Sequence, residues 1–381
     1  MIDGHGDDIY QYGELRCNFS SNISPLIDTS ALRQHLASRM EVIGHYPEPS
    51  AHSLEVLLAA RHGVSTGEVL VTSGATDAIY LIAQTLRSEK TFAVKRPTFS
   101  EYADACRMFG YEEVVGNAIP DLQSPTRSLS QRCGHGERPY HAGKRDLLDC
   151  HAGKRDLLDC HAGKRDLLRW LCNPNNPTGE VQSIGAVKEL AHRHRWLIID
   201  QSYEDYTLEP LLSAQEAVNM QNVIVIHSMT KRFAIPGLRL GYITAPREVV
   251  ACLRANYRPW AVNALAIEAG CYLLQSLEAS PTKSLERLFE ETTSLRDRLL
   301  EIPGIHVCPT STNFMLCSIK QGTAAELKDY LLTRHRFLIR DASNFEGLSA
   351  CHFRIATQLP EYNDELVEAI RSFCSRSRFP A

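Results

Sequence analysis

The sequence predicts an α/β protein with two domains: a large one built on a mainly parallel sheet between helices, and a smaller α+β one. Between residues 69 and 245, short apolar runs alternate with helical patterns, which is typical of a parallel sheet covered by helices. After residue 250 the pattern changes to long amphipathic helical segments followed by short strands. The length of 381 residues is enough for both domains to bury a core.

The expected elements follow this alternation along the chain. In the large domain we expect strands at 69–72, 91–94, 169–172, 196–200 and 223–227, and helices at 75–86 and 184–195. In the small domain we expect helices at 264–277, 284–302 and 364–375, and strands at 313–319, 337–342 and 352–357. The predicted division is an N-terminal arm with part of the small domain at 1–45, a large domain at 46–250 and a small C-terminal domain at 251–381.

Composition narrows the class of protein. The net charge of −4, with 23% charged residues, argues against a nucleic-acid binder. No apolar run approaches the roughly 18 residues of a membrane span, and the start "MIDGHGDDIY" lacks the apolar core of a secretory signal. The 12 cysteines are scattered, and we expect them to be reduced thiols. We therefore expect a cytoplasmic protein without membrane or nucleic-acid partners.

A ten-residue sequence is repeated in the middle of the chain. "HAGKRDLLDC" occurs at 141–150 and 151–160, and "HAGKRDLL" recurs at 161–168. Solenoid repeats are longer and need more apolar residues, so these units indicate a duplicated stretch. Because the third copy runs into the strand at 169–172, we expect residues 141–160 to be an insertion whose deletion leaves folding intact. Its adjacent Cys–His pairs lack the separation that structural zinc prefers, so we expect no metal site.

The segment "HSMTKRFAIPGLRLGY" follows an apolar strand and carries Ser228, Lys231 and Arg239. A lysine in such a position is ordinarily a solvated surface residue. In a cleft, however, desolvation or positive neighbours lower the pKa of a lysine and make its amine a nucleophile. Ser228 and Arg239 can hold a phosphate, and the Pro-Gly pair before the arginine allows the chain to turn back. The spacing therefore suits a lysine that binds a phosphorylated aldehyde.

Two further motifs lie at the ends of predicted strands. The strand at 69–72 runs into Gly74, Ala75 and Thr76, which open a helix whose free N–H groups can bind an anion. Asp200 ends a very apolar strand. Taken alone, the first motif is an ordinary strand–turn–helix connection and the second a helix N-cap. A phosphorylated ring cofactor would use the helix start for its phosphate and the carboxylate for its protonated ring nitrogen.

Together with "CNPNNPTGE" and "KRPTFSEY", these motifs resemble the aspartate aminotransferase superfamily, the fold type I pyridoxal-phosphate enzymes, over nearly the whole chain. The resemblance implies that pyridoxal 5'-phosphate is the cofactor and is bound covalently to Lys231. It also implies that Asp200 pairs with the pyridine nitrogen, and that Tyr203 and Asn176 bind the phenolic oxygen. Lys231, Asp200 and Tyr203 would then be the catalytic residues.

The same resemblance assigns the remaining cofactor contacts. The phosphate would lie between the helix start and the pair of Ser228 and Arg239. Tyr102 matches the aromatic residue that stacks on the pyridine ring, with Phe99 as the second choice. Tyr46 in "HYPEP" matches a tyrosine that reaches the cofactor phosphate of the neighbouring subunit, which implies a homodimer with shared active sites. One departure from the family pattern is Asp-Gln-Ser-Tyr where an Asp-Glu-Ala-Tyr-like run is usual.

Within the superfamily, the sequence resembles the branch of histidinol-phosphate aminotransferase and threonine-phosphate decarboxylase. Arg340 in "FLIRDASNFEGL" and Arg354 in "HFRIAT" match substrate arginines, although each could instead form a surface salt bridge. His5 in "GHGDD" and Asn22 in "NFSSNISPL" resemble substrate contacts of the decarboxylase. Asn176 is also expected to contact the substrate.

The expected substrate is a small phosphorylated amino acid or amine. The resemblance favours decarboxylation of L-threonine O-3-phosphate to aminopropanol phosphate for cobalamin side-chain synthesis. The alternative is histidinol-phosphate aminotransferase or another class I/II aminotransferase, which breaks a different bond at the substrate Cα. A regulator that only senses the cofactor would need a DNA-binding module, and we expect no room for one because the fold motifs begin within the first 25 residues.

Overall fold

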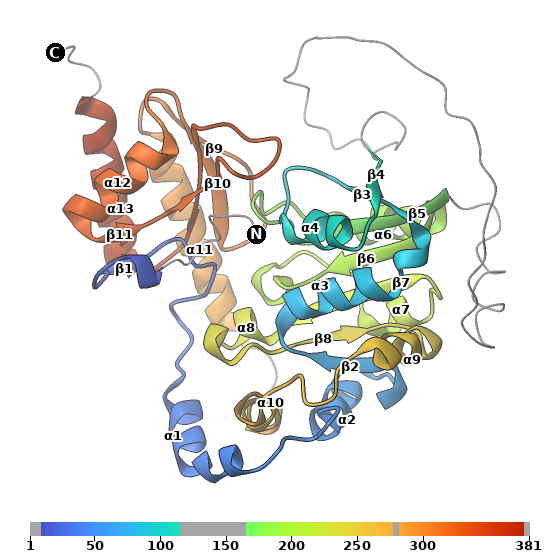
Figure 1. The fold of residues 1–381 in the computed structure, drawn as a ribbon. Helices are drawn as coiled ribbons and strands as arrows, with labels where there is room; N and C mark the ends of the chain where they lie inside the picture. The colour runs from blue at the N-terminus through green and yellow to red at the C-terminus, as the bar shows by residue number, and fades with distance from the viewer. Residues whose placement is uncertain (1–8, 115–164, 277–281, 377–381) are drawn as a thin grey trace, which may run out of the picture.

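The structure, a computed structural model, describes residues 9–114, 165–276 and 282–376 (Figure 1). Figure 1 shows a large part built around one long sheet, and a smaller part in which the C-terminal helices α11, α12 and α13 gather. The expected insertion at 141–160, with its Cys–His pairs, lies outside the described residues, as does His5.

Seven strands form the sheet of the large part, in the order β2-β8-β7-β6-β5-β3-β4. They are β2 (Val69–Thr72), β3 (Thr91–Val94), β4 (Glu112–Glu113), β5 (Arg165–Cys172), β6 (His194–Asp200), β7 (Val223–Ser228) and β8 (Gly241–Thr244). Only β8 runs antiparallel to its neighbours, so the predicted mainly parallel sheet is confirmed. The strands β4 and β8 were not predicted, because runs this short show no clear periodicity. The end of the third decapeptide copy enters β5, as expected.

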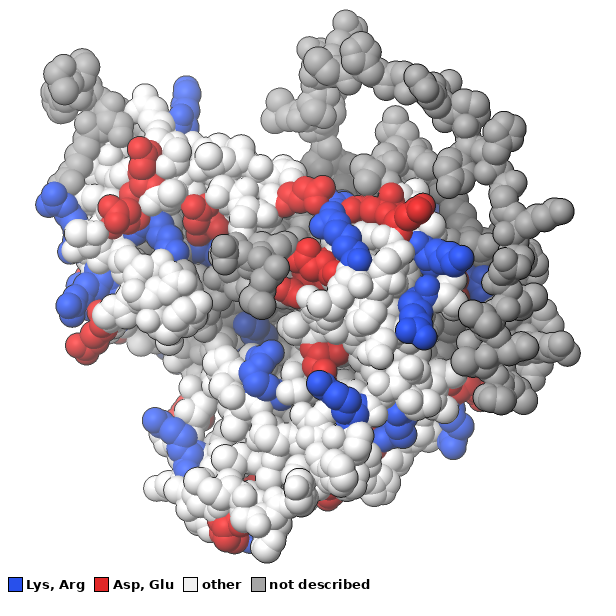
Figure 2. Space-filling model, in the orientation of Figure 1, with Lys and Arg blue, Asp and Glu red and all other residues white. Residues whose placement is uncertain are grey.

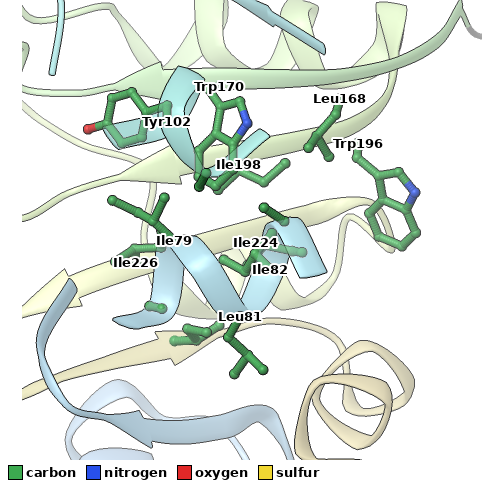
Figure 3. Close-up of a cluster of buried hydrophobic side chains, with 14 of the residues drawn as sticks. Ile79, Leu81, Ile82, Tyr102, Leu168, Trp170, Trp196, Ile198, Ile224 and Ile226 are labelled. Atoms are coloured by element: carbon green, nitrogen blue, oxygen red, sulfur yellow. The ribbon is translucent and has the colours of Figure 1, made fainter. Parts of the chain in front are cut away.

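Helices cover both faces of this sheet. One face carries α3 (Gly74–Thr85), α4 (Glu101–Met108) and α9 (Arg247–Asn256), and the other carries α2 (His52–His62), α6 (Ile184–Arg193), α7 (Ala214–Val218) and α10 (Ala264–Ser276). Figure 3 shows Ile79 and Ile82 of α3 close to Ile224 of the sheet, and all three are fully buried. Burial of each such side chain contributes about 1.5–3 kcal/mol to the stability of the fold, and this packing holds α3 against the sheet. The helix expected to reach residue 195 ends at Arg193, because His194 already pairs within the sheet.

The small part contains a four-stranded sheet in the order β12-β13-β10-β9. Its elements are β9 (Ile305–Val307), β10 (Phe314–Ile319), β12 (Arg340–Asp341), β13 (His352–Ala356), α11 (Thr282–Leu300), α12 (Ala324–His335) and α13 (Pro360–Arg376). The strand expected at 337–342 is in fact two strands. β11 (Phe337–Leu338) pairs in parallel with β1 (Cys17–Asn18) of the N-terminal arm, whereas β12 pairs with β13.

The helices that follow residue 250 pack on the large part. Leu253 of α9 joins the core beneath α3, and Ala266 and Leu273 of α10 pack in the same cluster as α2. The core of the small part instead combines Phe19 of the arm with residues from Leu295 onward. We therefore propose that the boundary lies between α10 and α11, later than the predicted residue 250.

The described surface carries charges of both signs. On the face drawn in Figure 2, lysines and arginines alternate with acidic residues in small groups. None of the helices within the described ranges is long and apolar enough to cross a membrane. The nine cysteines in these ranges are free, and the same ranges contain no group of three or more His, Cys, Asp or Glu side chains that could hold a metal ion.

Candidate active site

A cavity of about 340 Å³ lies where the large part, the small part and the N-terminal arm meet. It opens at the carboxyl ends of the parallel strands, which is the usual ligand position in such sheets. Its volume falls in the range of small-molecule sites, about 300–1,000 Å³. The predicted site residues that line it are Asn22, Ala75, Thr76, Tyr102, Asn176, Asp200, Tyr203, Ser228, Lys231, Arg239, Arg340 and Arg354.

Lys231 stands on a short helix directly after β7, a central strand of the sheet. The helix, α8 (Met229–Arg232), begins where the strand ends at Ser228, so the strand end brings both residues to the cavity. The Nζ atom of Lys231 lies 5.9 Å from the centroid of the Tyr203 ring. Because α8 follows β7 without a loop, Lys231 lies at the cavity.

The start of α3 and Arg239 meet on one side of the cavity. Gly74 has a φ of +85°, which favours glycine, and a Cβ there would lie 2.8 Å from Nη2 of Arg239 and would displace that side chain. A Cβ on Gly241 of β8 would lie 2.9 Å from the backbone nitrogen of Ala75. These two glycines let the strand and the arginine approach the free N–H groups of the helix start closely, which forms a cradle for an anion.

The turn that returns Arg239 to the cavity differs from the expected one. It is a 3-10 helix, η6 (Pro236–Leu238), and the left-handed residues are Ala234 and Arg239 itself, with φ of 53° and 56°, while Gly237 is not left-handed. Left-handed backbone at an arginine is uncommon and costs on the order of 1 kcal/mol, and such strain gathers at ligand sites.

Asp200, at the end of β6, is held through both carboxylate oxygens. Oδ1 accepts the backbone N–H of Ser202 at 2.9 Å, and Oδ2 accepts the hydroxyl of Tyr102 at 2.7 Å. Burial, and then the charge of Asp200, raise the pKa of Tyr102 well above its usual range, so this hydroxyl remains a donor. A buried carboxylate with a fixed orientation is suited to a protonated ring nitrogen.

Tyr102 does not have the surroundings expected of a stacking ring. Its side chain is fully buried and stacks on Trp170, with ring centroids 5.2 Å apart and planes 16° apart (Figure 3). Phe99 lies edge-on to Tyr102 at 5.7 Å and is partly exposed at the cavity. A ring that stacks on a cofactor needs a face open to the cavity. Phe99 therefore meets this condition better than Tyr102, the reverse of the predicted order.

The loop after β5 places Asn176 at the cavity. Asn173 exchanges hydrogen bonds with the backbone of Gln182, at 2.7 and 3.1 Å, which closes the loop on itself. The Oδ1 atom of Asn176 accepts a hydrogen bond from Arg354. The side-chain amide N–H groups of Asn176 therefore remain as its donors for a ligand oxygen.

Tyr203 offers a second donor. Its hydroxyl oxygen accepts the Nδ2–H of Asn22 at 3.1 Å, so its own proton can be donated elsewhere. Burial raises the pKa of Tyr203 to about 12, which keeps the hydroxyl protonated at neutral pH. The Oδ1 atom of Asn22 is buried without a hydrogen-bond partner among the described residues. Buried polar atoms are normally satisfied, so a ligand group is expected there.

Arg340 and Arg354 are direct partners in the β12–β13 pair, so their side chains share one face. Arg354 is 5% exposed and donates to Asn176 and, at 2.7 Å, to the carbonyl of Ser20. No carboxylate among the described residues pairs with it. Burial, and to a smaller extent Arg340, lower the pKa of Arg354 to about 10, so it remains charged at neutral pH. A buried cation beside a second cation favours an anionic ligand.

Tyr46 lies outside the cavity, 86% exposed, with its ring centroid 5.6 Å from that of Trp260, and its predicted reach into a neighbouring subunit stays a prediction. Ser20 and Ser21 of the arm line the cavity but were missed. A signal for them was present, because Asn18 accepts their backbone N–H groups in an Asx turn, at 3.0 and 3.2 Å.

The chain belongs to the aminotransferase class I and II family, whose sequence pattern matches residues 17–370. It is accordingly a pyridoxal-phosphate-dependent enzyme of fold type I. It is 29% identical to threonine-phosphate decarboxylase of Salmonella typhimurium, over 93% of this chain and 90% of that protein. It is 26% identical to histidinol-phosphate aminotransferase 2 of Archaeoglobus fulgidus, over 93% of this chain and 92% of that protein.

Among solved structures, the fold is similar to L-threonine-O-3-phosphate decarboxylase from Porphyromonas gingivalis. The TM-score is 0.78, with 33% sequence identity over 94% of this chain and 99% of that chain. The cavity fits the cofactor of the family. It combines a lysine, one oriented carboxylate, a hydroxyl donor beside an amide, and a helix start kept open by glycine beside an arginine.

Proposed function

We propose that the protein is a pyridoxal-phosphate-dependent L-threonine O-3-phosphate decarboxylase, which releases carbon dioxide and forms 1-aminopropan-2-yl phosphate, a precursor for the cobalamin side chain. The observation that carries the proposal is the pair of Arg340 and Arg354, two cations side by side at the cavity. Guanidinium groups suit both carboxylate and phosphate, and this substrate carries one of each. The 33% identity with a decarboxylase of known structure supports the same assignment.

In this proposal the large part holds the cofactor. Lys231 would hold its aldehyde carbon, Asp200 would pair with its ring nitrogen, and Asn176 and Tyr203 would donate to its phenolic oxygen. Phe99 packs on the ring. The bound cofactor supplies an electron sink for negative charge at the substrate Cα.

The phosphate of the cofactor occupies the cradle at the start of α3. Ala75 and Thr76 present backbone N–H groups there, and Ser228 and Arg239 complete the site. Tyr102 contributes indirectly, because its hydroxyl orients the carboxylate of Asp200.

The small part and the arm hold the substrate. Arg354 and Arg340 bind its two anionic groups, and Asn22 and Asn176 supply neutral hydrogen bonds. When the carboxylate leaves as carbon dioxide, a proton takes its place on Cα. Lys231 is the group placed to deliver that proton, because it lines the same cavity.

The experiment offers O-phospho-L-threonine to the enzyme without any keto acid. The expected result is release of carbon dioxide and formation of 1-aminopropan-2-yl phosphate. L-Threonine, which lacks the phosphate, is the matched control and should react far more slowly because one arginine then has no anion to bind. Failure to release carbon dioxide from the phosphorylated substrate would refute the proposal.

A second candidate is histidinol-phosphate aminotransferase, favoured by the 26% identity over 93% of the chain. Transamination breaks the Cα–H bond and not the Cα–carboxylate bond, and it requires a keto acid as amine acceptor. Turnover of histidinol phosphate only in the presence of 2-oxoglutarate, with none of O-phospho-L-threonine, would establish this candidate.

We also propose that the enzyme is a homodimer in which Tyr46 completes the partner's cofactor site. Tyr46 is 86% exposed and its ring lies beside that of Trp260, which is also exposed, and the chain just before it carries the exposed apolar residues Met40 and Ile43. Large apolar side chains exposed in this way favour a protein interface.

A mixing experiment tests this arrangement. Lys231→Ala and Tyr46→Ala proteins are each expected to be defective. If Tyr46 acts across the interface, mixed dimers contain one intact site, so mixing should restore activity above that of either protein. No restoration after verified subunit exchange, or a fully active monomer in sedimentation, would exclude the shared site.

A further inference from the structure

We propose that Tyr206 is a positioning residue that ties the backbone of Lys231 to the N-terminal arm, so that the lysine and the arm's substrate contacts are set in place together. The proposal rests on the proposed role of Lys231. It concerns a residue that the sequence patterns did not single out.

A short turn follows β6 and carries two tyrosines, Tyr203 and Tyr206. Tyr203 caps a 3-10 helix, η5 (Glu204–Tyr206), and residues three apart in such a helix lie on the same side. Both tyrosines therefore point toward the arm. The hydroxyl of Tyr203 accepts Nδ2–H of Asn22 at 3.1 Å, and the hydroxyl of Tyr206 accepts the backbone N–H of Ser24 at 2.9 Å.

The hydroxyl of Tyr206 makes a second contact, with the lysine itself. It donates its one proton to the backbone carbonyl of Lys231 at 2.7 Å. Tyr206 is 3% exposed, and burial raises its pKa well above its usual range, so the hydroxyl keeps this proton. One buried hydroxyl thus joins the arm to the residue proposed to bind the cofactor.

The backbone carbonyl of Lys231 lies at the end of its helix. Its helix, α8, spans four residues, so its carbonyl lies at a helix end where intrahelical partners are scarce. This carbonyl also accepts backbone N–H groups from Phe233, which caps the helix, and from Ala234, at the longer distance of 3.4 Å. At 2.7 Å, the bond from Tyr206 is shorter than the one from Ala234, and it comes from a side chain outside the helix.

The arm extends the connection to the substrate arginine. The carbonyl of Phe19 accepts the backbone N–H of Ala356, the last residue of the strand β13 that carries Arg354, at 2.9 Å. The carbonyl of Ser20 accepts Arg354 at 2.7 Å. Residues 19–20 of the arm are thus hydrogen-bonded to the small part, and Asn22 and Ser24 are hydrogen-bonded to Tyr203 and Tyr206. Through its hydroxyl, Tyr206 connects the arm to Lys231.

The test compares Tyr206→Phe with Tyr111→Phe in the full-length protein. Tyr111 is a matched control because it is also buried and its hydroxyl also donates to a backbone carbonyl, that of Ala83 at 2.8 Å. It lies in the core beneath α3, away from the arm. Amide hydrogen exchange of the Ser24 N–H is measured with and without cofactor, and steady-state kinetics with O-phospho-L-threonine.

Tyr206→Phe should increase exchange at Ser24 by about fivefold or more, the factor expected for the loss of one ordinary hydrogen bond. It should also raise KM and lower kcat by about fivefold each, because it loosens both the arm and the lysine. Tyr111→Phe should change neither arm exchange nor kinetics. Equal arm exchange in the two variants would overturn the proposal, as would a wild-type Ser24 N–H that exchanges at the unprotected rate.

The outcome is separable from the proposed function. If the protein is not a decarboxylase, the arm exchange still responds to Tyr206→Phe while O-phospho-L-threonine is not consumed. If Tyr206→Phe yields no folded protein, exchange of the Ser24 N–H in the wild type still decides whether the hydrogen bond forms.

Discussion

The two walls of the candidate active-site cavity differ in how the fold brings their residues together. On the wall of the large part, Asn176, Asp200 and Ser228 stand at or just after the carboxyl ends of β5, β6 and β7. On the wall of the small part, Arg340 and Arg354 lie within strands, and they meet because the register of β12 and β13 places them opposite each other. The first wall depends on where strands end, and the second on which strands pair.

This difference predicts separable effects of substitution. Changes on the wall of the large part should alter cofactor binding. Changes on the wall of the small part should raise KM for the substrate while cofactor binding persists.

The largest effect is expected for Lys231→Ala. Without the amine, the cofactor aldehyde has no covalent partner, so borohydride should no longer fix it to the protein, and turnover should fall at least about a thousandfold. Lys188→Ala, which removes a surface lysine paired with Glu216, serves as the control and should behave as wild type. A Lys231→Ala protein that still forms a reducible adduct would refute the assignment.

The next effect tests the wall of the small part. Arg354→Met should raise KM for O-phospho-L-threonine by about a hundredfold, since a buried charge-assisted bond is worth several kcal/mol. Arg340→Met should raise it less, by about tenfold, because Arg340 is only half-buried. Both variants should bind cofactor as the wild type does, measured by spectroscopic titration. A parallel loss of cofactor binding would show that the two walls are not independent.

A smaller effect separates the two aromatic residues on the wall of the large part. Tyr102→Phe removes a hydrogen bond to Asp200 and should weaken cofactor binding about fivefold. Phe99→Ala removes the ring exposed at the cavity and should weaken it by about tenfold or more. Titration of the apoprotein with pyridoxal phosphate measures both. If Phe99→Ala has no effect and Tyr102→Ala abolishes binding, Tyr102 stacks on the cofactor after all.

The smallest effect concerns the polar cluster behind the same wall. Burial, and then the charge of His227, lower the pKa of His62 to about 4, and its Nε2 is 2.7 Å from the hydroxyl of Tyr242. The unfolded chain takes up this proton below about pH 6.5, but the folded chain does not until about pH 4. The stability contributed by neutral His62 is thus present above pH 6.5 and is lost as the pH falls toward 4, by up to about 1.4 kcal/mol per pH unit.

Asp205 in the same cluster acts in the opposite direction, because burial raises its pKa to about 6. Its contribution is present at low pH and is lost as the pH rises through 6. The His62 contribution must therefore be isolated by comparison with His62→Asn. The stability advantage of the wild type over this variant should shrink by roughly 1 kcal/mol between pH 7 and pH 5, measured by urea unfolding. A difference that is independent of pH would show that His62 titrates normally.

The sequence by itself determined the parallel sheet and the wall of the large part. Apolar β-branched runs predicted β2, β3, β5, β6 and β7, and Asp200, Ser228 and Asn176 follow or end these runs as candidate site residues whose roles came from the resemblance to a known family. These assignments were possible because strand ends are local features, and the carboxyl ends of parallel strands lie along one sheet edge. The resemblance of the motifs to a known family then supplied the cofactor.

Only the tertiary structure decided the rest. Ser20 and Arg354 are 334 positions apart in the chain, and no local pattern shows that one accepts a hydrogen bond from the other. Phe99 and Tyr102 are equally aromatic in sequence and both line the cavity, but packing against Trp170 buries Tyr102 fully while Phe99 stays partly exposed. The same holds for Tyr206, whose hydroxyl acquires a role through the fold that brings the arm and Lys231 within 3 Å of it. Long-range pairing sets these contacts, because burial and register depend on the whole chain and not on neighbouring residues.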